Sequence, residues 1–239
     1  MDALIFSLAY AALAFVVFLL ARAADRATTV PLAALCALYL GLDDLLTGLP
    51  SASAAFAFID GDWNWSGKAY SLLLSAVVIV ALRMRREDLG LRLRQDAPRL
   101  AILAVLGFIA WGTCLGLLFQ PGAYDAETLA FQATMPGLSE ELVYRGIAPA
   151  ILMGATLGRR PSDRMPWAVI GATAVLFGAW HSLEYRDGAF GFELMFGLFP
   201  FIGSIAGGWL RFRTGSLLVP VLGHCLANVA FHVAGGLGG

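Results

Sequence analysis

The sequence predicts an all-α protein, a polytopic transmembrane helix bundle of about eight spans with any active site inside the bundle. The first observation is composition: 59% of the 239 residues are hydrophobic, 14% are charged, and the mean hydropathy is +0.75. Soluble domains are about 45–50% apolar and about 25% charged. In water such a chain would expose too much apolar surface to stay soluble. We therefore expect a multi-pass integral membrane protein, and the lack of targeting signals suits a prokaryotic inner membrane.

The second observation is a series of apolar windows, since a span needs about 20 mostly apolar residues. The third window is short and the fifth contains charges. The first has no basic segment before it, so we expect a retained span rather than a cleaved signal peptide. The expected spans are Ala3–Ala21, Val30–Leu49, Ala69–Leu82, Leu100–Phe119, Ala130–Leu157, Pro166–His181, Phe190–Leu210 and Ser216–Val233.

The third observation is that the odd-numbered connections between these spans are rich in arginine, whereas the even-numbered ones are mainly acidic. Cytoplasmic loops carry the excess of positive charge, so we expect both termini to face outward. The basic stretch Arg83–Arg99 is expected to form a helix lying against lipid headgroups. Trp63 and Trp65 fit an interfacial aromatic belt better than a binding cleft. The other arginines of the odd connections are Arg22, Arg26, Arg159, Arg160, Arg164, Arg211 and Arg213.

Few ionisable groups fall within the spans, and each costs roughly 2.5–3.5 kcal/mol to insert, so each needs a partner or a task. Glu193 lies near a span end and is expected to be solvated, and His232 lies near the membrane edge. The remaining groups are Asp43, Asp44, Glu140, Glu141, Arg145, His181 and His224.

The fifth window contains the run Ser139-Glu140-Glu141-Leu142-Val143-Tyr144-Arg145. Glu141 and Arg145 are four residues apart, the favourable order for an ion pair on one helix face. This leaves Glu140 without an obvious partner. Pro136 and Gly137 could break the helix and leave Ser139 as its N-cap. The run is equally compatible with a structural salt bridge and one solvated acid.

The histidines extend this cluster over further spans. His181 closes the run Phe177–His181, and His224 shares a helix face with Asn228 four residues later. At about 1.5 Å per residue, Glu140, His181, His224 and Asn228 all come between mid-bilayer and the outer surface. This depth allows them to converge.

Two kinds of chemistry suit such a set. Glu140 and His181 could hold and activate a water, while His224 and Asn228 stabilise the oxyanion formed when that water attacks a carbonyl. Alternatively, Glu140, His181 and His224 could bind zinc or another divalent metal. The His-Glu-x-x-His signature is absent and the three cysteines lack metal-site spacing, so we expect no cofactor.

Together, Glu140-Glu141-x-x-x-Arg145, Phe177-x-x-x-His181 and His224-x-x-x-Asn228 resemble the CPBP family of intramembrane proteases, which includes CAAX prenyl endopeptidases and bacteriocin-processing or Abi proteins. The resemblance covers about residues 100–233. It implies peptide-bond hydrolysis in the membrane, with Glu140 as base, His181 sharing the water, and His224 with Asn228 at the oxyanion. Glu141, Arg145 and Phe177 would be supporting residues. The family has been described both as metal-dependent and as glutamate-dependent without metal.

We accordingly divide the chain into N-terminal spans with the basic segment (1–99) and a protease-like core (100–239). The expected partners are membrane lipids and a hydrophobic, lipidated or membrane-anchored peptide. A net charge of −1 gives no indication of nucleic-acid binding. Two other functions remain open. A proton-coupled transporter would give Asp43 and Asp44 a role, and a catalytically silent scaffold could keep the same fold.

Overall fold

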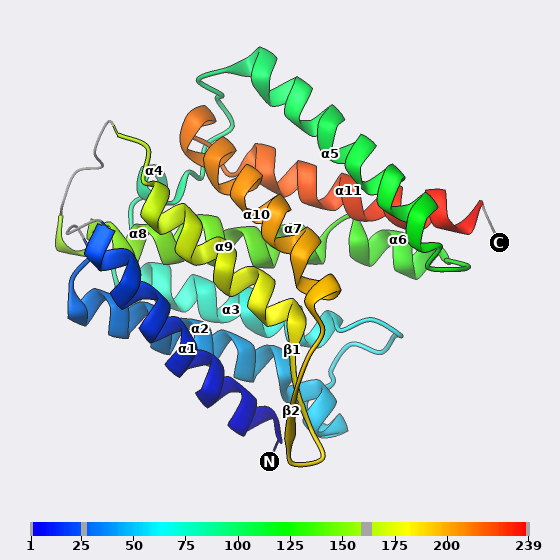
Figure 1. Ribbon diagram of the computed structural model, residues 1–239, viewed down its shortest axis with the longest axis horizontal. Coiled ribbons are helices and arrows are strands. Elements are labelled where there is room, and N and C mark those ends of the chain that lie inside the picture. Colours follow the sequence, from blue (N-terminus) through cyan, green and yellow to red (C-terminus); the bar gives the residue numbers. More distant parts are fainter. Residues whose placement is uncertain (1, 25–27, 159–163, 238–239) are drawn as a thin grey trace.

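The computed structural model describes residues 2–24, 28–158 and 164–237, which form a helical bundle with one small hairpin (Figure 1). Arg26, Arg159 and Arg160 lie outside the described residues. The elements in chain order are α1 (Asp2–Ala24), α2 (Val30–Ala52), the 3-10 turn Ala54–Phe56, α3 (Trp65–Ala81), α4 (Arg86–Leu89), α5 (Pro98–Phe119), α6 (Ala126–Gln132), α7 (Met135–Glu141), the π-helical segment η2 (Leu142–Ile147), α8 (Ala148–Leu152), the 3-10 turn Ala155–Leu157, α9 (Trp167–Ser182), β1 (Leu183–Arg186), β2 (Ala189–Phe192), α10 (Leu194–Thr214) and α11 (Leu218–Gly236).

Among the described residues, five helices are long and apolar enough to cross a membrane, namely α1, α2, α5, α10 and α11. This agrees with a multi-pass membrane protein. The shorter apolar helices α3 and α9 match the third and sixth expected spans. The expectation of eight continuous spans is wrong for the fifth window, which is divided into α6, α7, η2 and α8.

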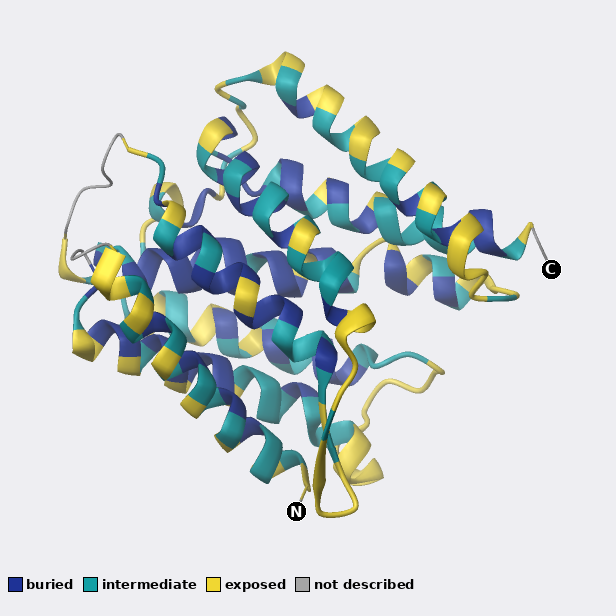
Figure 2. Ribbon diagram, viewed as in Figure 1, coloured by how far each residue is buried: buried dark blue, intermediate teal, exposed yellow. Residues whose placement is uncertain are grey.

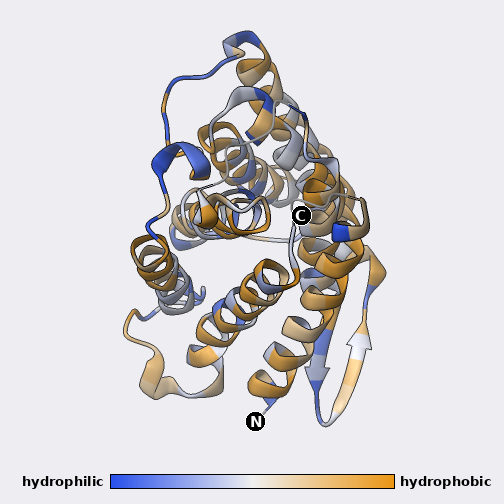
Figure 3. Ribbon diagram, turned by 90° about the vertical axis from the view of Figure 1, so that its left-hand side faces the viewer, coloured by the Kyte–Doolittle hydropathy of each residue, from blue (hydrophilic) through white to orange (hydrophobic). Residues whose placement is uncertain are grey.

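The outer surface of the bundle fits a hydrocarbon environment. Helix α5 packs along α11 and leaves a wide apolar face exposed, including Ile102 and Leu103 (Figure 2). Hydrophilic residues gather instead on α4 and the connecting segments (Figure 3). The first turn of both α2 and α5 contains a proline, which is tolerated there because those N–H groups have no helical partner.

The main core lies between α1, α2, η2, α8 and α9. Its largest fully buried side chains include Tyr10, Phe18, Leu40, Ile147 and Leu176. The hydroxyl of Tyr10 contacts that of Tyr144 at 2.7 Å and donates to the Leu176 carbonyl. These bonds join α1 to η2 and α9, two of the elements that carry the predicted site.

The basic segment does not form the expected interfacial helix. Only the single turn α4 is helical, because Gly90 adopts a left-handed conformation (φ 71°) that ends it. Arg92 then donates to the carbonyls of Thr214 and Gly215, in the turn between α10 and α11. Residues 91–97 are therefore a non-helical connection held against the turn between α10 and α11, and Pro98 and Arg99 already belong to α5.

A β-hairpin occupies the connection after α9, where the sequence analysis expected no strand. Leu183 pairs with Phe192 and Arg186 with Ala189. Asp187 and Gly188 both have positive φ, as a tight hairpin turn requires. Because the second strand takes Ala189–Phe192, α10 begins four residues later than the expected seventh span.

Candidate active site

The helix that carries Glu140 and Glu141 starts earlier than the sequence analysis expected. Thr134 lies at the N-cap of α7, and Pro136 lies in its first turn. The Ser139 hydroxyl donates to the carbonyl of Met135 at 2.8 Å, so Ser139 lies inside the helix and is not its cap. The two carboxylates consequently occupy the last turn of α7 and point into the bundle.

The π-helical segment η2 follows directly and carries Arg145. The N–H of Ala148 bonds to the carbonyl of Val143, five residues back, and Pro149 has no N–H to continue an α-helical ladder. Such π segments often mark functional sites. The predicted ion pair forms here: Arg145 Nε lies 3.2 Å from Glu141 Oε2, with both side chains buried. The guanidinium also lies 4.4 Å from the centroid of the Phe177 ring.

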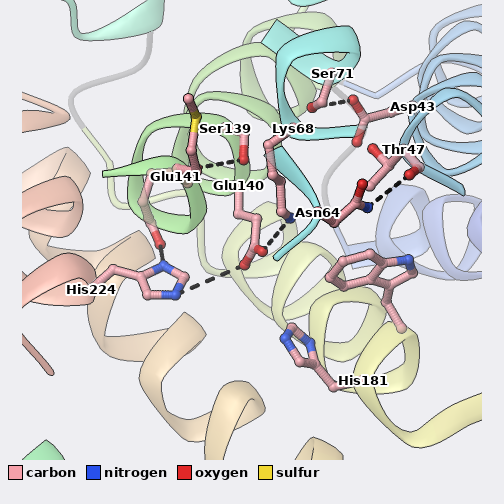
Figure 4. A network of polar contacts seen from close by, with 12 residues as sticks. Asp43, Thr47, Asn64, Lys68, Ser71, Ser139, Glu140, Glu141, His181 and His224 are labelled. Carbon is pink, nitrogen blue, oxygen red and sulfur yellow. Dashed lines mark hydrogen bonds and ion pairs between the residues drawn. The ribbon is translucent and has the colours of Figure 1, made fainter. Parts of the chain in front are cut away.

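His224 reaches Glu141 from α11. Its Nδ1 lies 2.8 Å from Glu141 Oε1, and since a carboxylate only accepts, Nδ1 is the donor. Its Nε2 lies 3.8 Å from Glu140 Oε2 (Figure 4). Helices α7 and α11 approach closely at Gly137, where a Cβ would collide with the sulfur of Cys225. This close approach brings His224 to both carboxylates.

His181 lies at the end of α9 with its tautomer fixed by the backbone. Its Nδ1 donates to the Phe177 carbonyl at 2.8 Å, so Nε2 of the neutral ring is an acceptor. The Phe177 ring packs against both imidazoles, with centroids 4.6 Å from His181 and 6.2 Å from His224. Phe177 thus contacts both histidines.

Asn228 lies one turn beyond His224 on α11. One of its amide hydrogens is already used, because Nδ2 donates to Gln132 Oε1 at 2.8 Å. The other remains available as a donor. This bond to α6 was not foreseen from the sequence and fixes the orientation of the amide.

All four predicted site residues line one cavity of about 1130 Å³. Glu140, His181, His224 and Asn228 form a polar zone, while aromatic side chains from α5 and α10 supply much of the apolar wall. The cavity extends to Asp2 at the start of α1 and to Glu184 and Tyr185 of the hairpin. Trp63 also lines it and stacks on Phe131, so this residue is part of the cavity wall, contrary to the expectation of a belt only.

The sequence analysis missed the partner of Glu140. Lys68, on α3, places its Nζ 2.6 Å from Glu140 Oε1, and both side chains are buried (Figure 4). The remaining oxygen, Oε2, has no hydrogen-bond partner among the described residues. The only available signal was that Lys68 is the sole lysine of the sequence.

The two aspartates of α2 lie beside this pair. Asp43 accepts from the Ser71 hydroxyl at 2.6 Å. Asp44 accepts from the Trp180 indole at 2.7 Å and from the Ser7 hydroxyl. Both carboxylates are therefore anchored by neutral donors.

The other ionisable groups lie outside this cluster. Glu193 is exposed at the N-cap of α10, as expected. His232 packs edge-on against Trp63 and is half-buried. Neither shares a hydrogen bond with the cavity residues described above.

The proposed zinc ligands do not form a metal-binding group in this arrangement. Within the described ranges, one group of three His, Cys, Asp or Glu side chains has its donor atoms within 4.8 Å of one another. This group is Asp62, Asp125 and Glu127. That group is already engaged: Asp125 caps α6, and Glu127 accepts from the Trp65 indole. Next to Glu140, moreover, a cationic position is taken by Lys68. In this arrangement, Glu140, His181 and His224 do not bring three donor atoms within 4.8 Å of one another.

Comparison with known proteins identifies one region of the chain. The family described as type II CAAX prenyl endopeptidase Rce1-like matches residues 124–230, which run from the loop before α6 into α11. No curated protein and no solved structure matches the chain.

Proposed function

Since residues 124–230 form a domain of the Rce1-like type II CAAX prenyl endopeptidase family, we propose that this protein is an intramembrane endopeptidase that hydrolyses a peptide bond with a water activated by Glu140. The observation that carries the proposal is Oε2 of Glu140, which is buried without a hydrogen-bond partner among the described residues and lies 3.8 Å from His224 Nε2. A buried carboxylate with one unoccupied oxygen is suited to accept a proton from water.

The residues can be assigned successive roles. A water held between Glu140 Oε2 and the acceptor Nε2 of His181 gives its proton to Glu140, and its oxygen attacks the carbonyl carbon of the substrate. The tetrahedral oxyanion then receives hydrogen bonds from His224 Nε2 and Asn228 Nδ2. Glu140 returns the proton to the leaving nitrogen as the carbon–nitrogen bond breaks. The products are a carboxylic acid and an amine, and the proton of the acid then passes to the amine or to water.

His224 can donate from Nε2 only as an imidazolium, because Nδ1 already donates to Glu141. Two carboxylates, Glu140 and Glu141, lie on either side of the ring, so this scheme places a positive ring between two negative groups. Arg145 in turn neutralises Glu141 and packs on Phe177. Glu141, Arg145 and Phe177 therefore support the reacting groups rather than contact the substrate in this scheme.

The cavity favours a hydrophobic, lipid-tailed or membrane-anchored peptide as substrate. Its apolar wall includes Phe108, Trp111, Phe199 and Phe231, which suit apolar side chains or a hydrocarbon tail. It reaches the N-terminal end of α1 and the hairpin. By the arginine distribution this is the non-cytoplasmic side, so we propose that a soluble product leaves there, across an inner membrane of a prokaryotic cell.

The alternative functions receive less support. The aspartates that would serve a proton-coupled transporter are each held by hydroxyl or indole donors. The scaffold hypothesis requires no general base, whereas Oε2 of Glu140 has no hydrogen-bond partner among the described residues.

The test is peptide cleavage by purified protein in liposomes, with a panel of hydrophobic and prenylated peptides. Glu140→Gln should lower kcat by about 100- to 10,000-fold, and His224→Ala should also abolish most turnover. Glu193→Gln, at an exposed acid outside the cavity, should leave kcat unchanged. A chelator should have no effect, since the donor atoms do not share a metal position. A folded wild-type protein that cleaves no peptide would favour the scaffold.

A further inference from the structure

Lys68 lines the same cavity and contacts Glu140, and neither the sequence motifs nor the family domain provides a role for it. It lies in the first turns of α3, where Asn64 caps the helix by accepting from the N–H of Gly67 at 3.0 Å. Its ammonium lies 2.6 Å from Glu140 Oε1 and 5.1 Å from the centroid of the Trp180 ring. The capped first turn of α3 thus fixes the position from which the Lys68 ammonium contacts the Glu140 carboxylate.

The residue type matters because the chain otherwise uses arginine for its cations. Of 16 Lys and Arg residues, Lys68 is the only lysine. A guanidinium tends to bind both oxygens of a carboxylate through parallel N–H donors, whereas an ammonium acts as a point charge. In the structure, Lys68 engages Oε1 and leaves Oε2 without a hydrogen-bond partner among the described residues. The contact therefore neutralises Glu140 without blocking its second oxygen.

We propose that Lys68 is a positioning residue for the hydrolytic reaction: it binds Glu140 through Oε1 alone and thereby holds Oε2 towards His224 and the cavity. This inference rests on the proposed function, in which Oε2 accepts the proton of the water. It also assigns a task to the N-terminal helices, since α3 precedes the matched segment 124–230. In this proposal, α3 contributes a side chain to the site itself.

A purely structural role for Lys68 is the competing explanation. Removing the cation leaves Glu140 as a buried unpaired charge, which is itself destabilising. Any cation that restores charge balance would then restore both folding and turnover. The positioning role predicts a different result. In that case kcat depends on a cation that binds only Oε1 of Glu140 and leaves Oε2 without a hydrogen bond.

The experiment compares four forms of the full-length protein in liposomes, each measured for kcat, KM and thermal unfolding. Lys68→Met removes the charge at similar side-chain length. Lys68→Arg keeps the charge but can engage both oxygens. Ser71→Ala, one turn further along α3, is the matched control, because it removes a buried hydrogen bond to Asp43 while the Ser71 hydroxyl makes no hydrogen bond to Glu140 or Lys68.

We expect Lys68→Met to lower kcat by about 10- to 100-fold with KM nearly unchanged, as for a misplaced catalytic group. Lys68→Arg should unfold near the wild-type temperature yet keep a reduced kcat. Ser71→Ala should shift the unfolding temperature without lowering kcat. A wild-type kcat in Lys68→Met, or full recovery of kcat in Lys68→Arg, would overturn the positioning role.

A second experiment tests the same role by chemical modification, in case the Lys68→Met protein does not fold. Lys68→Cys is combined with replacement of the three native cysteines by alanine, so that the introduced thiol, at a position that lines the cavity, is the only one in the chain that can be alkylated. Alkylation with 2-bromoethylamine places an ammonium at the length of lysine, and 2-bromoethanol places a hydroxyl there. We expect the ammonium to restore kcat and the hydroxyl to leave it low. Equal activity of the two adducts would overturn the proposal.

The outcomes also separate this inference from the proposed function. An active wild type, an inactive Glu140→Gln and a fully active Lys68→Met would leave the protease standing and remove only the role of Lys68. A wild type and Glu140→Gln that are equally inert would remove both.

Discussion

His224 donates from Nδ1 to Oε1 of Glu141 across 2.8 Å, joining α11 to the last turn of α7. The second oxygen of Glu141 pairs with Arg145, so the carboxylate is held from two sides. Carboxylates that bind one nitrogen of a histidine fix its tautomer and orientation and stabilise its charged form. Glu141 therefore controls which nitrogen of His224 faces Glu140 and the cavity.

We predict that Glu141→Gln lowers kcat by about 100-fold, as for loss of an oxyanion donor. The glutamine oxygen can still accept from Nδ1, so the ring can keep its place. In the proposed scheme, the positive ring then loses one of the two carboxylates that lie beside it. Steady-state kinetics should show KM nearly unchanged. An unchanged kcat would mean that His224 does not act as a charged donor.

The ion pair between Arg145 and Glu141 should contribute strongly to stability. Both side chains are 3% exposed, so Arg145→Met leaves a buried carboxylate without its cation. We predict a loss of about 3–5 kcal/mol in the free energy of unfolding, measured by denaturant titration in mixed micelles. The control is Arg85→Ala, whose pair with Glu87 is 70% and 72% exposed and should contribute less than about 1 kcal/mol. Equal losses in the two variants would contradict this assignment.

The sequence predicted contacts within one element better than contacts between elements. The pair of Glu141 with Arg145 follows from helical spacing and is confirmed. The contact of His224 with Glu141 joins residues 83 positions apart, so spacing could predict that the residues share a depth but not which carboxylate is bound. Whether these residues carry out catalysis stays a prediction.

Lys68 and the fifth window show why other features were missed. No local pattern links Lys68 to Glu140, since the contact depends on how α3 packs against α7. The window was predicted to be one span because most of its residues are apolar, although it contains charges. In the structure, Thr134 and Pro136 begin a new helix and Pro149 interrupts the hydrogen-bond ladder. The pair Asp187–Gly188, by contrast, is a recognisable hairpin-turn signal. It was overlooked because the search considered only long apolar windows.

Asp44 is expected to act as a structural acceptor, not as a proton carrier. We predict that Trp180→Phe lowers the free energy of unfolding by about 1–3 kcal/mol, because a buried carboxylate oxygen loses its indole donor. Asp44→Asn should be destabilising to a similar degree yet still cleave peptide. Proton flux into liposomes with a pyranine dye should not differ between wild type and Asp44→Asn. A flux that disappears in Asp44→Asn would instead support the transporter.

The approach of α11 to α7 at Gly137 should set the geometry of the site. A Cβ at this position would collide with the Cys225 sulfur and lie 2.9 Å from the Val221 carbonyl oxygen. Gly137→Ala must therefore push α11 outward and carry His224 away from Glu141. We predict a loss of about 100-fold in kcat, the order expected for a displacement of 1 Å.

Gly107 on α5 provides the matched control, because a Cβ there meets nothing within 4 Å. Gly107→Ala should leave kcat unchanged and add about 0.5–1 kcal/mol of helix stability. Adding Cys225→Ala to Gly137→Ala removes one of the two collisions and should restore part of kcat, whereas the carbonyl contact persists. If Gly137→Ala keeps the wild-type kcat, the position of His224 does not depend on the packing of these two helices, and the geometry derived for the oxyanion site is wrong.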